Sequence, residues 1–211
     1  MKKIAVVAAG GRVAKKVITE AVNRGFDVTA FGRKEENVTD AQTYIKKDIF
    51  DLTKADLAGF DAVVDAFGTW TEETLPQHST TLAHLCDLLA GTDTRLLIVG
   101  GAGSLYVDPE HTTTVSQLPT FPDAFKPVAF AQAAALADLR KRSDVKWTYI
   151  SPAADFQADG ERTGKYLLGG EEYFTNEAGE SVISYADYAI AMVDEIEKGS
   201  HIQERISVVK A

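Results

Sequence analysis

The 211-residue sequence lacks the features of a secreted or membrane-spanning protein. Its single cysteine, Cys86, cannot form an internal disulfide bond, which favours a reducing compartment, and its apolar neighbours indicate a buried side chain. No apolar run approaches the ~20 residues that cross a bilayer. The run Ile4–Ala9 is short and ends at two glycines instead of continuing to a signal-peptidase site. We therefore expect a cytoplasmic protein without a membrane partner.

Basic residues are fewer than acidic ones. There are 22 Lys and Arg against 31 Asp and Glu, which gives a net charge of −9. This balance argues against nucleic acid or an anionic lipid surface as a partner. An anionic small molecule remains compatible, because a few cations reverse the field inside a cleft. The contents of 45% hydrophobic and 25% charged residues are typical of a globular domain.

The sequence is also poor in metal-binding and hydrolytic motifs. Four histidines are present, but no two are spaced i, i+4 and none lies near a carboxylate cluster, so we expect no metal site. The Gly-x-Ser-x-Gly elbow of hydrolases is absent, as is the Gly-Lys-Thr/Ser motif that binds phosphates in nucleotide phosphatases. These absences argue against both enzyme classes.

Apolar runs alternate with stretches of helical periodicity along the chain. Ile4–Ala9 is suited to a buried strand, and from Arg12 to Arg24 apolar residues recur at helical spacing before Gly25 ends the helix. The same alternation predicts further strands at 26–33, 43–45, 60–68, 95–106 and 146–153, and further helices at 80–90 and 126–141. It predicts an α/β fold, a doubly wound parallel sheet with helices on both faces.

Two stretches interrupt this alternation. Residues 106–125 contain three prolines and show little periodicity, so we expect a long loop that is either a functional lid or disordered. Residues 155–183 indicate a small β-rich cap, followed by a helix that begins near Ser184. The chain 1–211 is thus predicted to be a single domain with an appended cap.

The first strand and helix are joined by Ala8-Ala9-Gly10-Gly11-Arg12-Val13-Ala14. A short-spaced dinucleotide-binding turn reads G-x-x-G-x-x-G, and only the middle of its three glycines is kept here, at Gly11. Free backbone amides and the positive end of the helix dipole, which bind phosphate, survive these changes. The turn is either a plain tight corner or a cofactor site. In the second case its contacts are Ala8, Gly10, Gly11, Arg12 and Val13.

Ligands bind parallel sheets of this kind at the carboxyl ends of the strands. The further candidate cofactor contacts are Arg33, Asp48, Ile49, Phe67, Gly68, Gly101 and Ala153. No acidic residue stands at the end of the second strand to bind a ribose 2′-hydroxyl. Arg33 and Lys34 suit a 2′-phosphate, so NADP(H) is favoured over NAD(H) unless both cations are merely solvated. Asp48 either reaches the adenine amino group or caps a helix.

Four stretches resemble the family of NADH-flavin reductases, atypical short-chain dehydrogenase/reductases related to biliverdin-IXβ reductase and NmrA-like proteins. They are GGAGSLYV, FKPVAFAQAAALADLR, WTYISPAADFQADGERTGKYLLGG and ISYADYAIAMVDEIE. The resemblance extends from Ile4 to Val209 and implies an NAD(P)-binding Rossmann fold and reduction of a flavin or a similar acceptor. Two positions depart from the family pattern, since Ala8 replaces a glycine and Phe125 stands where relatives have tyrosine.

The usual proton donor of the wider superfamily is missing. That donor is a tyrosine four residues before a lysine, and none of the seven tyrosines has a lysine at this offset. Reduction of a flavin or quinone needs less, because negative charge delocalises over the ring until water supplies a proton. We therefore expect an NAD(P)H-dependent reductase of a planar acceptor. The alternative is a non-catalytic NADP(H)-sensing regulator of the NmrA-like type.

Three residues are candidate catalytic contacts to the acceptor. Ser104 either hydrogen-bonds the substrate or caps a turn, and Tyr106 either stacks on the acceptor or bridges the core and the loop. Lys126 either offsets charge on an anionic substrate or is a solvated residue at the start of a helix. In the cap, Arg162 and Lys165 either meet a flavin phosphate or are solvated.

Overall fold

The computed structural model describes residues 2–211 and has a mostly parallel sheet at its centre. The strand order is β3-β2-β1-β4-β5-β6-β10-β8, and β8 alone runs antiparallel to its neighbour. The bounds are β1 (Lys3–Val7), β2 (Asp27–Gly32), β3 (Thr43–Lys46), β4 (Ala62–Asp65), β5 (Arg95–Val99), β6 (Lys146–Ser151), β8 (Tyr166–Gly169) and β10 (Glu204–Lys210). This confirms the predicted Rossmann-type α/β fold.

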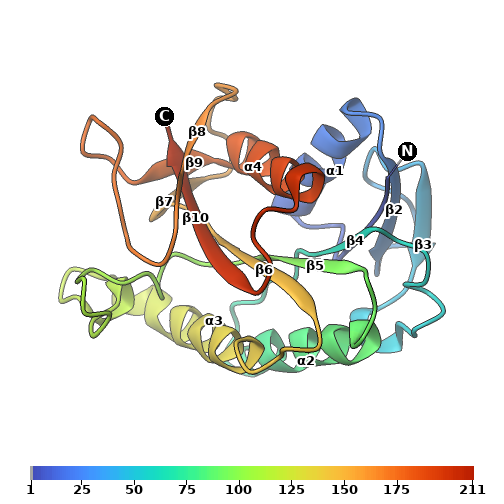
Figure 1. Ribbon diagram of the computed structural model, residues 1–211, viewed down its shortest axis with the longest axis horizontal. Coiled ribbons are helices and arrows are strands. Elements are labelled where there is room, and N and C mark those ends of the chain that lie inside the picture. The colour runs from blue at the N-terminus through green and yellow to red at the C-terminus, as the bar shows by residue number, and fades with distance from the viewer. Residues whose placement is uncertain (1) are drawn as a thin grey trace.

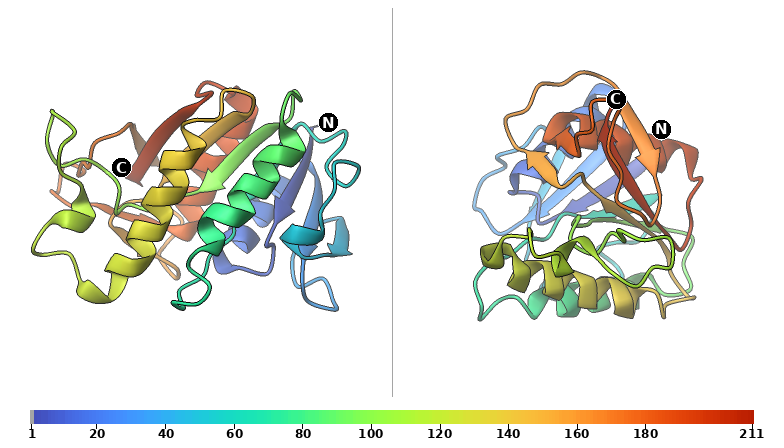
Figure 2. Two further views of the ribbon diagram at one scale, coloured as in Figure 1. Left: turned by 90° about the horizontal axis from the view of Figure 1, so that it is seen from below. Right: turned by 90° about the vertical axis from the view of Figure 1, so that its left-hand side faces the viewer.

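Helices cover both faces of the sheet (Figure 1). One face carries α1 (Arg12–Asn23) and α4 (Tyr185–Lys198), and α2 (Gln77–Leu89) and α3 (Lys126–Leu139) lie side by side on the other (Figure 2). Because both faces are covered, β1 is buried from Ile4 to Val7. Each face therefore has its own hydrophobic core.

The strand β10 is the one large element that the sequence patterns miss. It lies beside β6, and its five central residues are buried, among them Arg205 and Ser207. These two polar residues interrupt the apolar run, so periodicity alone does not reveal a strand. The last helix begins as predicted, because the Ser184 hydroxyl accepts a hydrogen bond from the Asp187 amide and caps α4.

The predicted cap at 155–183 is partly built into the main sheet. β7 (Asp155–Gln157) and β9 (Val182–Ser184) form a separate parallel pair, whereas β8 pairs with β10 and extends the large sheet. The amides of Thr163 and Gly164 donate hydrogen bonds to the buried carboxylate of Asp187 in α4. The cap is therefore anchored on both β10 and α4.

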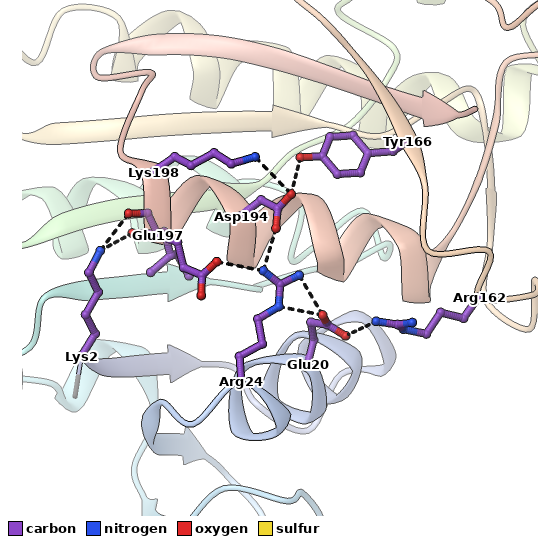
Figure 3. A network of polar contacts seen from close by, with 9 residues as sticks. Lys2, Glu20, Arg24, Arg162, Tyr166, Asp194, Glu197 and Lys198 are labelled. Carbon is purple, nitrogen blue, oxygen red and sulfur yellow. Dashed lines mark hydrogen bonds and ion pairs between the residues drawn. The ribbon is translucent and has the colours of Figure 1, made fainter.

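An ionic network ties α1 to α4 and to the cap (Figure 3). Arg24, the C-cap of α1, contacts Glu20 of this helix at 2.8 Å and Asp194 of α4 at 2.6 Å. Glu20 also pairs with Arg162 of the cap at 3.0 Å, and the Tyr166 hydroxyl donates to Asp194 at 2.8 Å. Charge-assisted bonds between partly buried groups are stronger than ion pairs in open solvent. The helix that follows the glycine turn is thus held by both of its neighbours.

The glycine-rich exit of β5 is required by close packing. A Cβ at Gly100 would lie 2.2 Å from the ring of Tyr149 in β6. A Cβ at Gly101 would lie 2.1 Å from Oε1 of Gln132 in α3. These approaches let β6 and α3 close on the end of β5, so a structural role alone accounts for both glycines.

Candidate functional site

A cleft of about 680 Å³ opens at the carboxyl ends of β1, β2, β4, β5 and β6. Every predicted cofactor-binding residue lines it except Ala153, which is buried shortly after β6. The lining residues concerned are Ala8, Gly10, Gly11, Arg12, Val13, Arg33, Asp48, Ile49, Phe67, Gly68 and Gly101. These segments lie far apart in the sequence, and the strand order brings them to one edge of the sheet.

The turn after β1 holds an alanine in an unfavourable conformation. Ala8 has a φ of 54°, in the left-handed region that favours glycine. The Gly11 amide donates to the Ala8 carbonyl at 3.2 Å, and Gly11 is the N-cap of α1. Within residues 2–211 no side chain caps this helix, and its first turn carries no acidic residue. The amides at the start of α1 therefore suit an anion in the cleft.

A basic rim, made of Arg33, Lys34 and Lys47, borders the cleft at the ends of β2 and β3. The Arg33 side chain is 84% exposed, and its Nε lies 4.0 Å from the Asp48 carboxylate. Asp48 accepts a hydrogen bond from the Phe50 amide at 3.0 Å and so caps a short 3-10 turn. The Arg33 guanidinium is thus accessible to a ligand, whereas Asp48 already has a structural partner.

Buried polar groups fix the loop after β4, which forms part of the cleft wall. The carboxylate of Asp65 accepts a hydrogen bond from the Phe67 amide, and burial raises the pKa of Asp65 to about 6. His78 of α2 hydrogen-bonds the Thr69 carbonyl at 3.0 Å, and burial lowers the pKa of this histidine. The His78 and Phe67 rings meet edge-on with centroids 5.6 Å apart. These contacts hold Phe67 at the cleft.

Several side chains at the cleft are not found by reasoning from the sequence. They are Trp70, Gln77, Gln132, Phe156 and Tyr185. The Trp70 side chain is 75% exposed. The Phe156 and Tyr185 rings lie 4.2 Å apart between centroids, and the Arg12 guanidinium lies 5.8 Å from the Tyr185 ring. Gln132 alone leaves a signal in the sequence, as a single amide in an alanine-rich helix.

Two predicted acceptor contacts, Ser104 and Tyr106, do not line the cleft. The buried Arg205 of β10 donates to the Ser104 hydroxyl at 3.2 Å and pairs with Glu171 of the cap at 2.6 Å. The Tyr106 ring stacks on His111 with centroids 4.3 Å apart, and it lies 5.8 Å from the Arg205 guanidinium. These contacts tie the start of the long loop to β10 and the cap.

The third candidate, Lys126, pairs with the exposed carboxylate of Asp123 at 2.6 Å at the start of α3. It also lies outside the lining of the cleft. The structure therefore brings the predicted cofactor contacts together but leaves all three candidate catalytic residues elsewhere. Their roles in the reaction stay predictions.

Other kinds of site find no support in the described part of the chain. Among residues 2–211, no three His, Cys, Asp or Glu side chains are grouped so that they could hold a metal ion. No helix in the same range is long and apolar enough to cross a membrane. Cys86 is buried in α2, and burial raises the pKa of its thiol to about 12, which makes it a poor nucleophile.

Comparison with known proteins identifies relatives over the full length of the chain. The NAD(P)H-binding family model matches residues 8–198. The uncharacterised protein YwnB of Bacillus subtilis (strain 168) is 42% identical over 208 residues, which are 98% of this chain and 98% of YwnB.

Solved structures of the same fold carry differing descriptions. A "putative NADH-flavin reductase" from Streptococcus pneumoniae TIGR4 is 55% identical with a TM-score of 0.98, over 100% of both chains. A "putative epimerase" from Bacteroides thetaiotaomicron is 34% identical with a TM-score of 0.87, over 99% of this chain and 97% of the other. The fold is thus shared by proteins to which different reactions are ascribed.

We expect Ala8→Gly to raise the free energy of unfolding by about 0.5–1 kcal/mol, because glycine adopts the left-handed conformation without a Cβ clash. Ala90→Gly is the control, since Ala90 ends α2 with a φ of −53° and gains nothing from glycine. This second variant should be destabilised, because glycine adds freedom to the unfolded chain. Urea denaturation measures both. A destabilised Ala8→Gly would show that the methyl group makes contacts worth more than the strain.

Asp65 should make stability depend on pH, because burial raises its pKa to about 6 from an ordinary value of 3.8. The Asp65 carboxyl makes its full contribution to the free energy of unfolding when the pH is below its ordinary pKa of 3.8. This contribution is lost as the pH rises through the raised pKa of about 6. The variant Asp65→Asn keeps an acceptor for the Phe67 amide. Between about pH 4 and pH 7 it should gain roughly 1–3 kcal/mol of stability relative to the wild type, measured by urea unfolding.

Asp56 provides a control, because its pKa is shifted in the opposite direction to that of Asp65. Hydrogen bonds from Lys47 and Thr53 lower the pKa of Asp56 to about 2. The stability of Asp56→Asn relative to the wild type should therefore fall slightly over the same pH range. If the difference in free energy of unfolding between Asp65→Asn and the wild type stays constant with pH, the Asp65 carboxyl has an ordinary pKa in the folded protein.

Proposed function

The chain belongs to the NAD(P)H-binding family, and from this premise we propose that it is a reductase that binds NADPH in the cleft and reduces a planar acceptor such as a flavin or a quinone. The observation that carries the proposal is the turn from Ala8 to Gly11, where the N-terminus of α1 meets the cleft without a side-chain cap. The Streptococcus pneumoniae protein, described as a "putative NADH-flavin reductase", supports hydride transfer from a reduced nicotinamide to a flavin, and the choice of NADPH rests on the end of β2 alone.

The residues at the cleft fit a dinucleotide. The amides of Arg12 and Val13, in the first turn of α1, would hold the pyrophosphate. The basic rim would hold the adenosine end, because in this fold the end of β2 meets the adenosine ribose. The other half of the molecule would then extend toward the ends of β5 and β6, where Gly101 and Pro152 line the cleft.

The end of β2 supports a preference for NADPH. Arg33 and Lys34 follow this strand, and both line the cleft. A carboxylate directly after β2 would bind the two ribose hydroxyls of NADH and repel a 2′-phosphate, and the residues that follow the strand are instead Arg33 and Lys34. An accessible guanidinium binds phosphate well because its planar fork donates two hydrogen bonds at once.

The lining of the cleft supports an acceptor that needs no dedicated proton donor. When bound, reduced nicotinamide supplies a hydride, which is two electrons and one proton, and becomes oxidised, while water supplies the acceptor's second proton. The side chains near the ends of β5 and β6 are the amide of Gln132 and the rings of Phe156 and Tyr185. Their contribution is to bind the ring, to orient it and to exclude bulk water.

We expect the protein to oxidise NADPH in the presence of FMN, riboflavin or menadione, with saturation in the acceptor. Because no side chain has to act as the acid, kcat should change little between about pH 6 and pH 8. Steady-state absorbance assays measure both features. Tight NADPH binding without oxidation by any flavin or quinone would instead favour an NADP(H)-sensing regulator.

We expect Arg33→Ala to weaken NADPH binding by about tenfold, the effect of losing one charge-assisted contact, and to leave NADH binding nearly unchanged. Lys141→Ala is the matched control, because Lys141 is an exposed cation that pairs with Asp138 and lies outside the cleft. Isothermal titration calorimetry measures both cofactors. Equal losses of affinity for NADPH and NADH would contradict the assignment of Arg33 to the 2′-phosphate.

A further inference from the structure

The cleft has two chemically different ends. The basic rim borders it at β2 and β3, whereas the lining at the other end includes Gln132 of α3, Pro152 after β6 and Phe156 of β7. A dinucleotide with its phosphates at the start of α1 and its adenosine over β2 must place its reactive ring at this second end. The acceptor has to meet that ring, so it must bind among the same residues.

Gln132 presents a carboxamide at this end of the cleft. The side chain packs so closely on Gly101 that a Cβ there would lie 2.1 Å from its Oε1. Gln132 is half-buried, it lines the cleft, and its carboxamide has no hydrogen-bond partner among residues 2–211. The carboxamide is not among the buried polar atoms of residues 2–211 that lack a partner, so solvent reaches it and both its donor and its acceptor are free to pair with a ligand in the cleft.

Resting on the proposed function, we propose that Gln132 orients the acceptor and that the acceptor is a nitrogen heteroaromatic ring with a lactam edge, of which a flavin is one case. A carboxamide holds an acceptor oxygen and a donor NH₂ side by side in one plane. It therefore forms two hydrogen bonds with an edge on which N–H adjoins C=O. A quinone offers only carbonyl oxygens, so it forms one.

A rigid aromatic wall at the same end favours a flat ring. Phe156 and Tyr185 line the cleft with their rings tilted by 52° to one another. Phe156 is held from behind by the buried Tyr188, with centroids 4.9 Å apart. The Arg12 guanidinium over the Tyr185 ring adds positive potential, which stabilises an acceptor that gains negative charge as it is reduced.

Two variants of Gln132 separate its hydrogen bonds from its volume. Gln132→Met keeps the length and removes both polar groups, and Gln132→Glu replaces the donor NH₂ by a second acceptor oxygen and adds a negative charge. At saturating NADPH we expect kcat/KM for FMN to fall about tenfold in Gln132→Met, whereas kcat/KM for menadione falls by less than about threefold. In Gln132→Glu, kcat/KM for FMN should fall at least as far as in Gln132→Met, because the carboxylate cannot donate to the ring and its charge opposes the negative charge that the acceptor gains.

Gln77→Met is the matched control. Gln77 lines the same cleft from α2 but follows the loop after β4 and does not pack on the end of β5. Any effect of this variant should be equal for FMN and menadione. NADPH binding, measured separately by fluorescence titration, should be the same in Gln132→Met as in the wild type.

The outcomes distinguish this proposal from the proposed function. Equal losses with FMN and menadione, or weakened NADPH binding in Gln132→Met, would overturn the role of Gln132 toward the acceptor. If the wild type binds NADPH but does not turn over, quenching of FMN fluorescence in the presence of NADP⁺ is the second readout. Quenching that Gln132→Met weakens supports the proposal, and no quenching contradicts it. A wild type that binds no NADPH would overturn the proposed function itself.

Discussion

The sharp turn between β1 and α1 is the constraint on which the cleft depends, because it sets where the helix amides lie relative to the strand ends. Burial on both faces fixes the end of β1, so the chain must reverse within a few residues, and Ala8 takes a left-handed conformation to do so. The far part of α1 is held by Arg24 on Asp194 of α4 and by Glu20 on Arg162 of the cap. A strained residue persists only where the surrounding structure determines its position, and these contacts supply that support.

The order of the sheet follows from local patterns because parallel strands covered on both faces are continuous apolar runs. Val6 and Val7 in β1 illustrate this, since both are completely buried. β10 breaks the rule. Arg205 is stable inside this strand only because Glu171 and Ser104, both distant in the sequence, satisfy its guanidinium. Local periodicity contains no information about such partners, so β10 cannot be predicted from the pattern of its own residues.

One half of the cleft can be predicted from local sequence patterns, and the other half depends on contacts between distant segments. The candidate cofactor contacts at the glycine turn and at the ends of β2 and β4 come from backbone positions that a strand–turn–helix pattern locates directly. Gln132 reaches the cleft only because α3 packs against the end of β5 at Gly101, and no motif encodes that approach. Tyr106 shows the converse. Its place after β5 allowed either stacking on the acceptor or a bridge between the core and the loop, and in the fold its ring lies against His111 and near Arg205.

The separation of charge along the cleft explains how an acidic protein can serve an anionic cofactor. Fields from distant carboxylates are screened over about 8 Å at physiological ionic strength, so the residues that border the cleft affect a bound ligand more than the net charge of −9 does. Many carboxylates are moreover paired, as Glu171 is with Arg205 and Arg140. The basic rim lies at one end, and Gln132, Phe156 and Tyr185, with Arg12 beside Tyr185, line another part of the cleft, so in the proposed function different residues select the cofactor and the acceptor. Substitutions in the basic rim can therefore change the choice of cofactor without altering the surface that the acceptor meets.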